Sequence, residues 1–440
     1  MKTFKRGGVH PEENKLSENQ PIEVLSVPKR VTILLGQNLG ASSKPVVNKR
    51  DKVKVGQLIA KGEAFISANL HSPVSGTVLK IDDVPDQVGY NKAAIVIDVD
   101  GDEWVEGIVR SSEIAKDIKL SKEEIVKKIQ EMGIVGLGGA AFPTHIKLMV
   151  PEGKVLNVLI INGVECEPYL TADHRLMLEK GEELLIGINI LMKGLGVSKA
   201  IIGIESNKAD AIHHLKELAN NFLGIEVQSL KVKYPQGGEK QLIKALINRE
   251  VPSGKLPLDV GCVVSNVGTA FAVYEAVQKN KPLIDRVVSV TGKSVRKPSN
   301  LLVRIGTPIS DLIEKVEGLP EDTGKIIGGG PMMGKTMISL NAAVIKGTSG
   351  ILVMREKESS RIAVKNCIRC AKCVSVCPMG LSPYLLAIYG EQERYEDAGL
   401  EDVMDCIECG SCHYICPSGR PLLDYLRVDK VRVGEIMRNR

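Results

Sequence analysis

The stretches CIRCAKCVSVCP (residues 367–378) and CIECGSCHYICP (residues 406–417) are two copies of one pattern. In each copy the cysteines follow the spacing C-x2-C-x2-C-x3-C, and a proline follows the last cysteine. Thiolates at this spacing on one loop can converge on an iron–sulfur cubane, while nearby backbone N–H groups solvate the sulfide. The repeated pattern therefore predicts two 4Fe–4S clusters.

The order of the cysteines also predicts which thiolates share a cluster. In two-cluster ferredoxins the fourth cysteine of a run normally ligates the other cluster. We therefore expect one cluster on Cys367, Cys370, Cys373 and Cys416, and the second on Cys406, Cys409, Cys412 and Cys377. Two structural zinc sites or a disulfide scaffold are the alternatives, but zinc sites usually pair two short C-x2-C units. The expected chemistry is one-electron transfer rather than substrate turnover at iron.

Helical patterns at residues 383–393 and 422–433 flank the cysteine runs. They predict a helical two-cluster ferredoxin domain over residues 355–440. The remaining two of the ten cysteines, Cys166 and Cys262, stand apart and are expected to be small core residues.

Composition narrows the class of protein. The chain has 440 residues and a net charge of +5, a mild excess that does not indicate a nucleic-acid-binding protein. At about 100–200 residues per domain, this length predicts two to four domains. No apolar run approaches the ~18 residues of a membrane span, and the N-terminus lacks the apolar core of a signal peptide. We expect a soluble, intracellular chain that reaches a membrane only through a partner.

Short β-type runs broken by glycine and proline occupy residues 31–99 and predict an all-β unit within residues 1–110. Residues 54–60 and 72–78 resemble the barrel-sandwich hybrid of biotinyl and lipoyl carriers. Those carriers present a lysine at a hairpin tip, whereas residues 71–76 (HSPVSG) contain none. We expect a structural or docking module without a swinging prosthetic group.

Strand and helix patterns alternate in the middle of the chain. Ser121 and Glu124 form a capping-box pattern before a helix that runs to Gly133. Strands at 155–161 and 200–204 alternate with helices at 176–195 and 209–222, which predicts a multidomain α/β protein with a mostly parallel sheet within residues 111–283. Short strands around one helix at 309–316 predict a compact β-grasp-like module over residues 284–350.

Two glycine-rich loops match nucleotide-binding patterns only in part. Residues 136–141 (GLGGAA) satisfy G-x-G-x-x-A, but a helix precedes them and Pro143 follows, which excludes an ordinary Rossmann site. Such dense glycines still let backbone N–H groups approach an anionic or planar ligand. Residues 329–336 (GGPMMGKT) match the phosphate-loop spacing, but Pro331 removes an N–H group, so we expect a turn instead.

Four segments, in order, resemble the flavin segments of the NADH-binding subunit of respiratory complex I. They are GLGGAAFPTHIK (136–147), NGVECEP (162–168), YPQGGE (234–239) and SNVGT (265–269). The opening residues 4–15, the barrel-like unit and the double cluster motif are not features of complex I. With them, nearly the whole chain resembles the RnfC-type subunit of the Rnf ion-translocating ferredoxin:NAD oxidoreductases.

This resemblance implies a peripheral electron-transfer subunit on the cytoplasmic face of the plasma membrane. Its cofactors would be non-covalent FMN and two 4Fe–4S clusters, with NAD(H) as substrate. Its partners would be the other subunits of the membrane complex and, indirectly, ferredoxin. Because the protein's part is to place the cofactors, no side chain is expected to act as a catalytic acid or base.

The resemblance also implies residue roles. The glycine loop would approach FMN, Lys147 would compensate phosphate charge, and the two asparagines would bond the flavin edge. Phe142 would offer a face for the nicotinamide or adenine, Glu165 would contact the ring or ribose, and Tyr234 and Glu239 would lie nearer the nucleotide. The implied cofactor-binding set is Gly136, Gly138, Gly139, Phe142, Lys147, Asn162, Glu165, Tyr234, Glu239 and Asn266.

Three positions depart from the complex I protein. Val164 stands where that protein has an acid, Gly238 replaces one of its paired glutamates, and Leu137 replaces an arginine. Two alternatives therefore stay open. A corrin reductase of a bacterial microcompartment resembles this family in its domains and cofactors. An inactive flavin-like domain would leave the clusters as a non-enzymatic relay.

Overall fold

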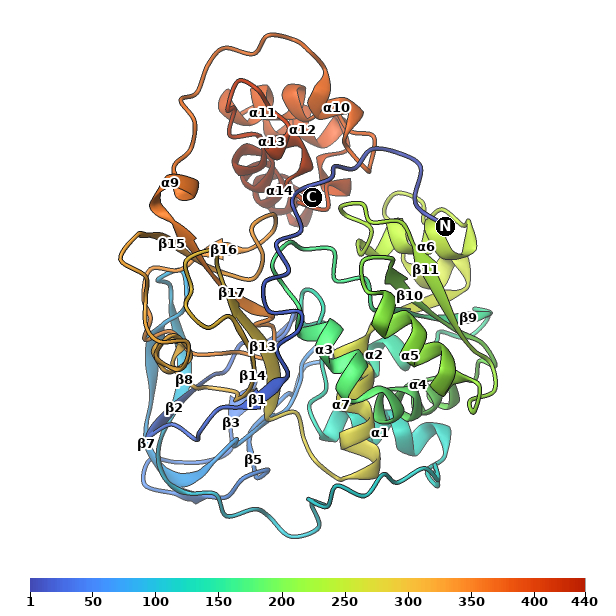
Figure 1. Ribbon diagram of the computed structural model, residues 1–440, viewed down its shortest axis with the longest axis vertical. Helices are drawn as coiled ribbons and strands as arrows, with labels where there is room; N and C mark the ends of the chain where they lie inside the picture. The colour runs from blue at the N-terminus through green and yellow to red at the C-terminus, as the bar shows by residue number, and fades with distance from the viewer. Residues whose placement is uncertain (440) are drawn as a thin grey trace.

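Two antiparallel sheets form the first unit of the computed structural model, which describes residues 1–439 (Figure 1). Their strands are β2 (Arg30–Leu34), β3 (Lys44–Pro45), β4 (Lys52–Val53), β5 (Leu58–Lys61), β6 (Leu70–His71), β7 (Ser75–Pro85) and β8 (Asn91–Gly101). One sheet has the order β2-β8-β7-β4 and the other β3-β5-β6. Residues 71–76, where a carrier would present its lysine, are buried, so this unit displays no prosthetic tip.

A four-stranded parallel sheet lies at the centre of the second unit. Its strands are β9 (Val158–Asn162), β10 (Ala200–Glu205), β11 (Ile225–Leu230) and β12 (Cys262–Asn266), in the order β11-β10-β9-β12. Buried Ile, Val and Leu side chains fill the strands, as expected for a sheet covered on both faces. The helices are α1 (Lys122–Glu131), α2 (Thr144–Leu148), α3 (Ala172–Glu179), α4 (Gly181–Leu195), α5 (Ala209–Ala219), α6 (Glu239–Ile247) and α7 (Val267–Gln278), with a 3-10 turn at Pro257–Val260.

The boundaries of this unit differ from the sequence prediction by a few residues at several places and most clearly at two. The Ser121–Glu124 capping box is present as expected. However, the helix predicted over 176–195 is two helices, because the backbone leaves helical geometry at Lys180. Gly181 then packs so closely against α5 that a Cβ would lie 2.9 Å from His214 Nε2. Strand β9 starts at Val158 rather than Val155, whose side chain is exposed.

A six-stranded mixed sheet, with the order β1-β14-β13-β17-β15-β16, forms the third unit. Its elements are β1 (Ile22–Val24), β13 (Asp285–Thr291), β14 (Ser299–Arg304), α8 (Ile309–Lys315), β15 (Thr323–Gly328), β16 (Lys335–Thr336) and β17 (Gly350–Arg355). The first strand comes from the N-terminal segment and pairs in parallel with β14. The N-terminal segment therefore completes a module that is otherwise built from residues nearly 300 positions later.

Short helices form the last unit, which lies at the top of the molecule in Figure 1. They are α9 (Glu356–Ser359), which precedes the unit, and α10 (Lys372–Ser375), α11 (Pro383–Glu391), α12 (Tyr395–Leu400), α13 (Ser411–Tyr414) and α14 (Leu422–Arg438), with a 3-10 turn at Val403–Asp405. Leu386 of α11 and Leu426 of α14 lie in one buried core with Cys377 and Cys412. Each cysteine run thus contributes at least one residue to the core of this unit.

The first fifteen residues join the second and last units. Val9 and Tyr234 exchange backbone hydrogen bonds of 2.8 and 2.9 Å, which attaches the segment beside the parallel sheet. The N–H group of Gly8 donates to the carbonyl oxygen of Val376 at 2.8 Å, directly before Cys377. Gly7 adopts a positive φ of 66°, and a Cβ there would lie 2.5 Å from that same carbonyl oxygen. Only a glycine allows this close approach.

Candidate functional site

The carboxyl ends of β9 and β12 define the candidate flavin site. Asn162 and Asn266 are the last residues of these strands, and they are register partners in the parallel pair. From β9 the chain proceeds to β10 and β11 on one side, and β12 then pairs with β9 on the other side. Ligands of open parallel sheets bind at such a switch point, beyond the carboxyl ends of the strands.

The glycine loop lies over this switch point. The Leu137 N–H donates to Thr269 Oγ1 of α7 at 2.9 Å, and the Gly136 N–H donates to the Phe142 carbonyl at 2.9 Å. Gly138 packs against Asn266, so that a Cβ would lie 2.7 Å from its Nδ2 atom. Gly138, Gly139 and Ala140 are exposed, and their N–H groups donate to no acceptor within residues 1–439.

This donor set fits FMN. Consecutive free N–H groups on a glycine-rich loop form an anion-binding concavity suited to a phosphate. The amides of Asn162 and Asn266 supply donors and acceptors for the polar edge of a flavin. Phe142, at the end of the loop, is half-buried.

Asn266 is held in one orientation by its neighbours. Its Oδ1 atom accepts from the Gly268 N–H at 2.8 Å and caps α7. Its Nδ2 group donates to Asp173 Oδ2 at 2.7 Å and to the Asn162 carbonyl at 3.3 Å. Burial, and then the charge of Glu165, raises the pKa of the Asp173 carboxyl. Asp173 was absent from the predicted set, since nothing local in the sequence marks it.

Lys147 and Glu239 come together as an ion pair with an N–O distance of 3.6 Å. Lys147 also donates to the Val264 carbonyl at 2.9 Å, which places it beside β12. Glu239 opens α6 and is exposed. The flavin segments at residues 162–168 and 234–239 are joined by two hydrogen bonds. Asn162 Nδ2 donates to the Gly237 carbonyl at 2.9 Å, and the Gly237 N–H donates to Cys166 Sγ at 3.4 Å.

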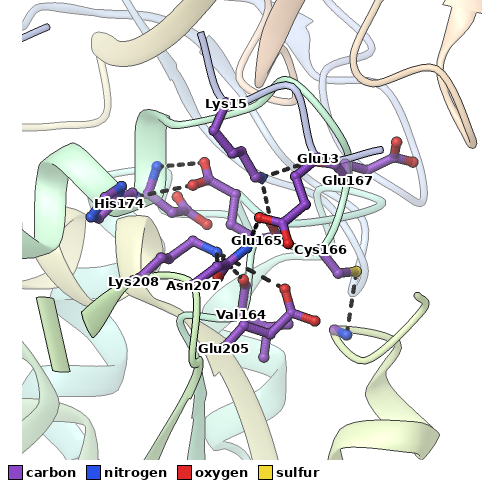
Figure 2. A network of polar contacts seen from close by, with 12 residues as sticks. Glu13, Lys15, Val164, Glu165, Cys166, Glu167, His174, Glu205, Asn207 and Lys208 are labelled. Carbon is purple, nitrogen blue, oxygen red and sulfur yellow. Dashed lines mark hydrogen bonds and ion pairs between the residues drawn. The ribbon is translucent and has the colours of Figure 1, made fainter. Parts of the chain in front are cut away.

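Two lysines hold the second flavin segment (residues 162–168) by its backbone carbonyls, as Figure 2 shows. Lys15 Nζ donates to the carbonyls of Glu165 and Glu167 at 2.8 and 2.9 Å (Figure 2). It also donates to the Leu170 carbonyl at 2.7 Å. Lys208, whose side chain is 2% exposed, donates to the Val164 carbonyl at 2.8 Å.

Charge balance explains how these cations are tolerated. Burial lowers the pKa of Lys15 to about 8, and the positive charge of Lys208 acts in the same direction, against the opposing effect of Glu165 and Glu205. Glu205 lies 4.0 Å from Lys208, and burial raises the pKa of this carboxyl to about 7. With its carbonyls turned towards the lysines, the segment leaves the N–H groups of Glu165, Cys166 and Glu167 without an acceptor in residues 1–439.

The carboxylates of the second segment serve as structural acceptors. Glu165 accepts from the N–H groups of Asp173 and His174 at 2.8 and 3.1 Å, at the start of α3. Glu167 accepts from the N–H groups of Met332 and Met333 at 3.1 and 2.9 Å. The GGPMMGKT stretch is therefore a turn docked on Glu167, as expected, rather than a phosphate cradle. Burial raises the pKa of Glu167 to about 7.

Tyr234 lies against the last unit instead of facing an open nucleotide site. Its side chain is buried, and its hydroxyl donates to the Cys409 carbonyl at 2.8 Å. Gln241 of α6 adds a bond from Nε2 to the Pro378 carbonyl at 3.4 Å, beside Cys377. These contacts bring the flavin side of the molecule directly against one set of cysteines.

Four cysteines drawn from both runs gather at one cavity. Cys377, Cys406, Cys409 and Cys412 line one cavity, although Cys377 belongs to the first run. Burial raises the pKa of the Cys373 thiol, and the charges of Cys416 and Cys367 act in the same direction. A soft four-thiol donor set around a cavity fits a 4Fe–4S cluster. Within residues 1–439, no three Cys, His, Asp or Glu side chains are arranged to hold a single metal ion.

The two cysteine sets differ in exposure. Cys377, Cys409 and Cys412 are buried and Cys406 is partly buried, whereas Cys367 and Cys370 are exposed. Cys262 is a buried residue of β12, as predicted. Cys166 is only partly buried, lies beside the Gly237 N–H, and has its pKa raised to about 12 by burial.

A flavin-type switch point and two thiolate sets together define an electron-transfer protein of the flavin and iron–sulfur class. Four family models match the chain: the RnfC barrel sandwich hybrid domain (residues 2–102), the Nuo51 FMN-binding domain (129–275), the SLBB domain (287–336) and the 4Fe-4S dicluster domain (359–417). They confirm the predicted fold class, the FMN-binding domain and the pair of 4Fe–4S clusters.

Curated relatives match over most of their length. The RnfC-type subunit of the proton-translocating ferredoxin:NAD(+) oxidoreductase complex of Clostridium ljungdahlii is 48% identical, over 90% of this chain and 86% of the relative. Its counterpart in the Na(+)-translocating complex of Acetobacterium woodii is 43% identical, over 97% of this chain and 96% of the relative. This chain belongs to the family of RnfC-type subunits of the ion-translocating ferredoxin:NAD(+) oxidoreductase complexes.

One solved structure, an NAD+-reducing [NiFe]-hydrogenase in the H2-reduced state, overlaps in part. It is 19% identical with a TM-score of 0.47, over 66% of this chain and 52% of that chain. A search of residues 1–439 for a helix both long and apolar enough to cross a bilayer finds none.

Proposed function

We propose that this chain is the peripheral subunit through which electrons pass between NADH and the membrane part of an ion-translocating oxidoreductase complex. The observation that carries the proposal is the contact between the flavin side and a cluster site, made by Tyr234 and the Cys409 carbonyl. We place the protein on the cytoplasmic face of the plasma membrane, because NADH and ferredoxin are cytoplasmic. Membrane attachment then comes from partner subunits.

When bound, FMN would supply hydride exchange with NADH and single-electron transfer to the clusters. The free N–H groups of Gly138, Gly139 and Ala140 would hold its phosphate, and Gly136 would let the loop turn. Lys147 would neutralise phosphate charge, while Asn162 and Asn266 would orient the flavin edge. Phe142 and Glu239 border the nucleotide, and Glu165 keeps the second segment on α3 rather than touching the substrate.

Departures from the complex I protein are compensated within this fold. Val164 is buried, and its carbonyl is fixed by Lys208. Leu137 is held through its backbone, by Thr269 at its N–H and by Arg286 Nη2 at its carbonyl at 3.4 Å. The loop geometry therefore does not depend on the missing acid or arginine. This supports an active flavin domain over the inactive scaffold.

The difference in exposure between the two cysteine sets supports an order for the clusters along the electron path. The set of Cys377, Cys406, Cys409 and Cys412 is nearer the flavin side, through Tyr234 and Gln241. The set of Cys367, Cys370, Cys373 and Cys416 is more exposed and would exchange electrons with partners. The division into units at residues 1–110, 111–283, 284–350 and 355–440 is part of this proposal.

Anaerobic reconstitution with iron, sulfide and FMN tests the proposal. We expect about eight irons per chain, two interacting EPR signals on reduction, and bleaching of the flavin absorbance by NADH. Four irons per chain would contradict the two-cluster assignment. A bound flavin that NADH does not bleach would instead favour the inactive scaffold.

A further inference from the structure

The segment that carries the exposed cysteines is basic and apolar. Residues 360–372, called the basic loop below, contain Arg361, Lys365, Arg369 and Lys372 and no acidic residue. Every residue of the loop is exposed. Figure 1 shows the chain between α9 and α10 arching around the outer side of the last unit, away from the parallel sheet.

The charges of this loop are largely uncompensated. Arg361 pairs with Asp424 of α14. Lys365, Arg369 and Lys372 form no ion pair with any side chain in residues 1–439. Most other basic side chains of the last unit are paired, including Arg420 with Glu391 at 2.6 Å and Lys430 with Glu408 at 2.9 Å. The loop is thus a local concentration of free positive charge.

Aliphatic side chains alternate with these charges. Ile362, Val364 and Ile368 are 62%, 60% and 66% exposed. Large aliphatic residues this exposed, clustered among free charges, are typical of a recognition surface rather than of a solvated loop.

The loop is fixed beside the first cysteine set. The Lys365 N–H donates to the Ser418 carbonyl at 2.9 Å, two residues after Cys416. Ile362 lies over Gly419, where a Cβ would be 2.7 Å from its Cγ1 atom. The loop also contains Cys367 and Cys370 themselves. A partner seated here would lie directly over the more exposed cluster.

We propose that the basic loop is the docking surface for an acidic protein domain that carries a one-electron redox centre. The proposal rests on the cluster assignment made above. Free positive charge selects an acidic face and speeds its approach, and the exposed aliphatic residues give the short-lived complex an apolar centre. Contact over the exposed cysteines would keep the distance between the two redox centres short.

Binding of an acidic two-cluster bacterial ferredoxin to the reconstituted full chain tests this without turnover. We expect the Kd, measured anaerobically by biolayer interferometry, to rise about tenfold between 20 and 200 mM NaCl. The variant K365E/R369E/K372E should bind about tenfold more weakly at low salt and lose most of the salt dependence. A basic c-type cytochrome should not bind the wild type.

Matched variants separate the loop from general charge effects. K29E/K49E/K52E changes three exposed lysines of the barrel-like unit and should alter the Kd less than about twofold. V364S/I368S should weaken binding while leaving the salt dependence unchanged. Every variant must match the wild type in iron content and in flavin bleaching by NADH. A failure of the proposed function would appear in these two measurements on the wild type, and not in the Kd. Equal weakening by both triple variants, or none by the loop variant, would overturn the proposal.

Discussion

The hydroxyl of Tyr234 donates a 2.8 Å hydrogen bond to the carbonyl oxygen of Cys409, so a residue of the flavin motif touches a cluster loop directly. The same hydroxyl lies 3.5 Å from Glu167 Oε1. Because the bond is buried, its loss leaves an unpaired carbonyl at the junction.

Tyr234→Phe should therefore loosen this junction by about 1–2 kcal/mol. We expect faster amide exchange in residues 406–412 and slower reduction of the clusters by NADH, while FMN affinity stays unchanged. Hydrogen exchange and stopped-flow absorbance measure the two effects. Unchanged exchange in the cysteine loop would show that the bond does not hold the units together.

Neighbouring glycines give a matched test of the flavin loop. In Gly138→Ala the new Cβ would lie 2.7 Å from Asn266 Nδ2, so the loop must shift and FMN affinity should fall at least about tenfold. Gly139→Ala meets nothing within 4 Å and should bind FMN nearly as the wild type does. Quenching of FMN fluorescence reports both affinities. An equal loss of FMN affinity in the two variants would contradict this arrangement of the loop around the flavin.

Removing Lys15 should disturb the flavin site from a distance. Lys15→Met leaves three carbonyls without their donor, and we expect a loss of about 3 kcal/mol in the free energy of unfolding. The flavin midpoint potential should also change, because a buried positive charge is lost. Denaturant unfolding and spectroelectrochemistry measure these separately. Lys49→Met, at an exposed site, is the control and should change neither.

The crossed ligation makes an unusual prediction. Cys377 belongs to the first run, but Cys377→Ala should remove the cluster held by Cys406, Cys409 and Cys412. Cys416 belongs to the second run, but Cys416→Ala should remove the cluster held by Cys367, Cys370 and Cys373. Each variant should retain about four irons and one EPR signal. The surviving signals of Cys377→Ala and Cys370→Ala should therefore differ. If they coincide, each run ligates its own cluster.

Glu167 predicts a pH dependence of stability. Its folded-state pKa of about 7 is above the ordinary value of 4.5, so the folded protein keeps a proton that the unfolded chain releases between these values. Stability should therefore fall as pH rises from 4.5 to 7, by about 3 kcal/mol for this group. Glu167→Gln should flatten the part of this slope accessible between pH 5.5 and 8 in thermal unfolding. If the slope is unchanged in this variant, the pH dependence of stability arises from Glu205 and Asp173 instead.

Local pattern was enough to predict the two-cluster domain, the glycine loop and the alternating strands and helices, because each depends on spacing within a few turns of chain. The pattern did not predict what distant segments supply. Lys15 lies in the opening motif, but its acceptors are 150 or more residues away. The bond from the Tyr234 hydroxyl to the Cys409 carbonyl could not be predicted either, because the two residues are 175 positions apart in the chain. The strand pairing of Ile22–Val24 with β14 is non-local in the same way.

The N-terminal segment has a consequence for biosynthesis. Gly8 is synthesised about 370 residues before its partner Val376. The segment around Gly8 must therefore wait unpaired while the intervening polypeptide is made, and its docking site is complete only once the cysteine domain has folded. Docking of this segment on the cysteine domain is therefore a late step in the folding of the chain.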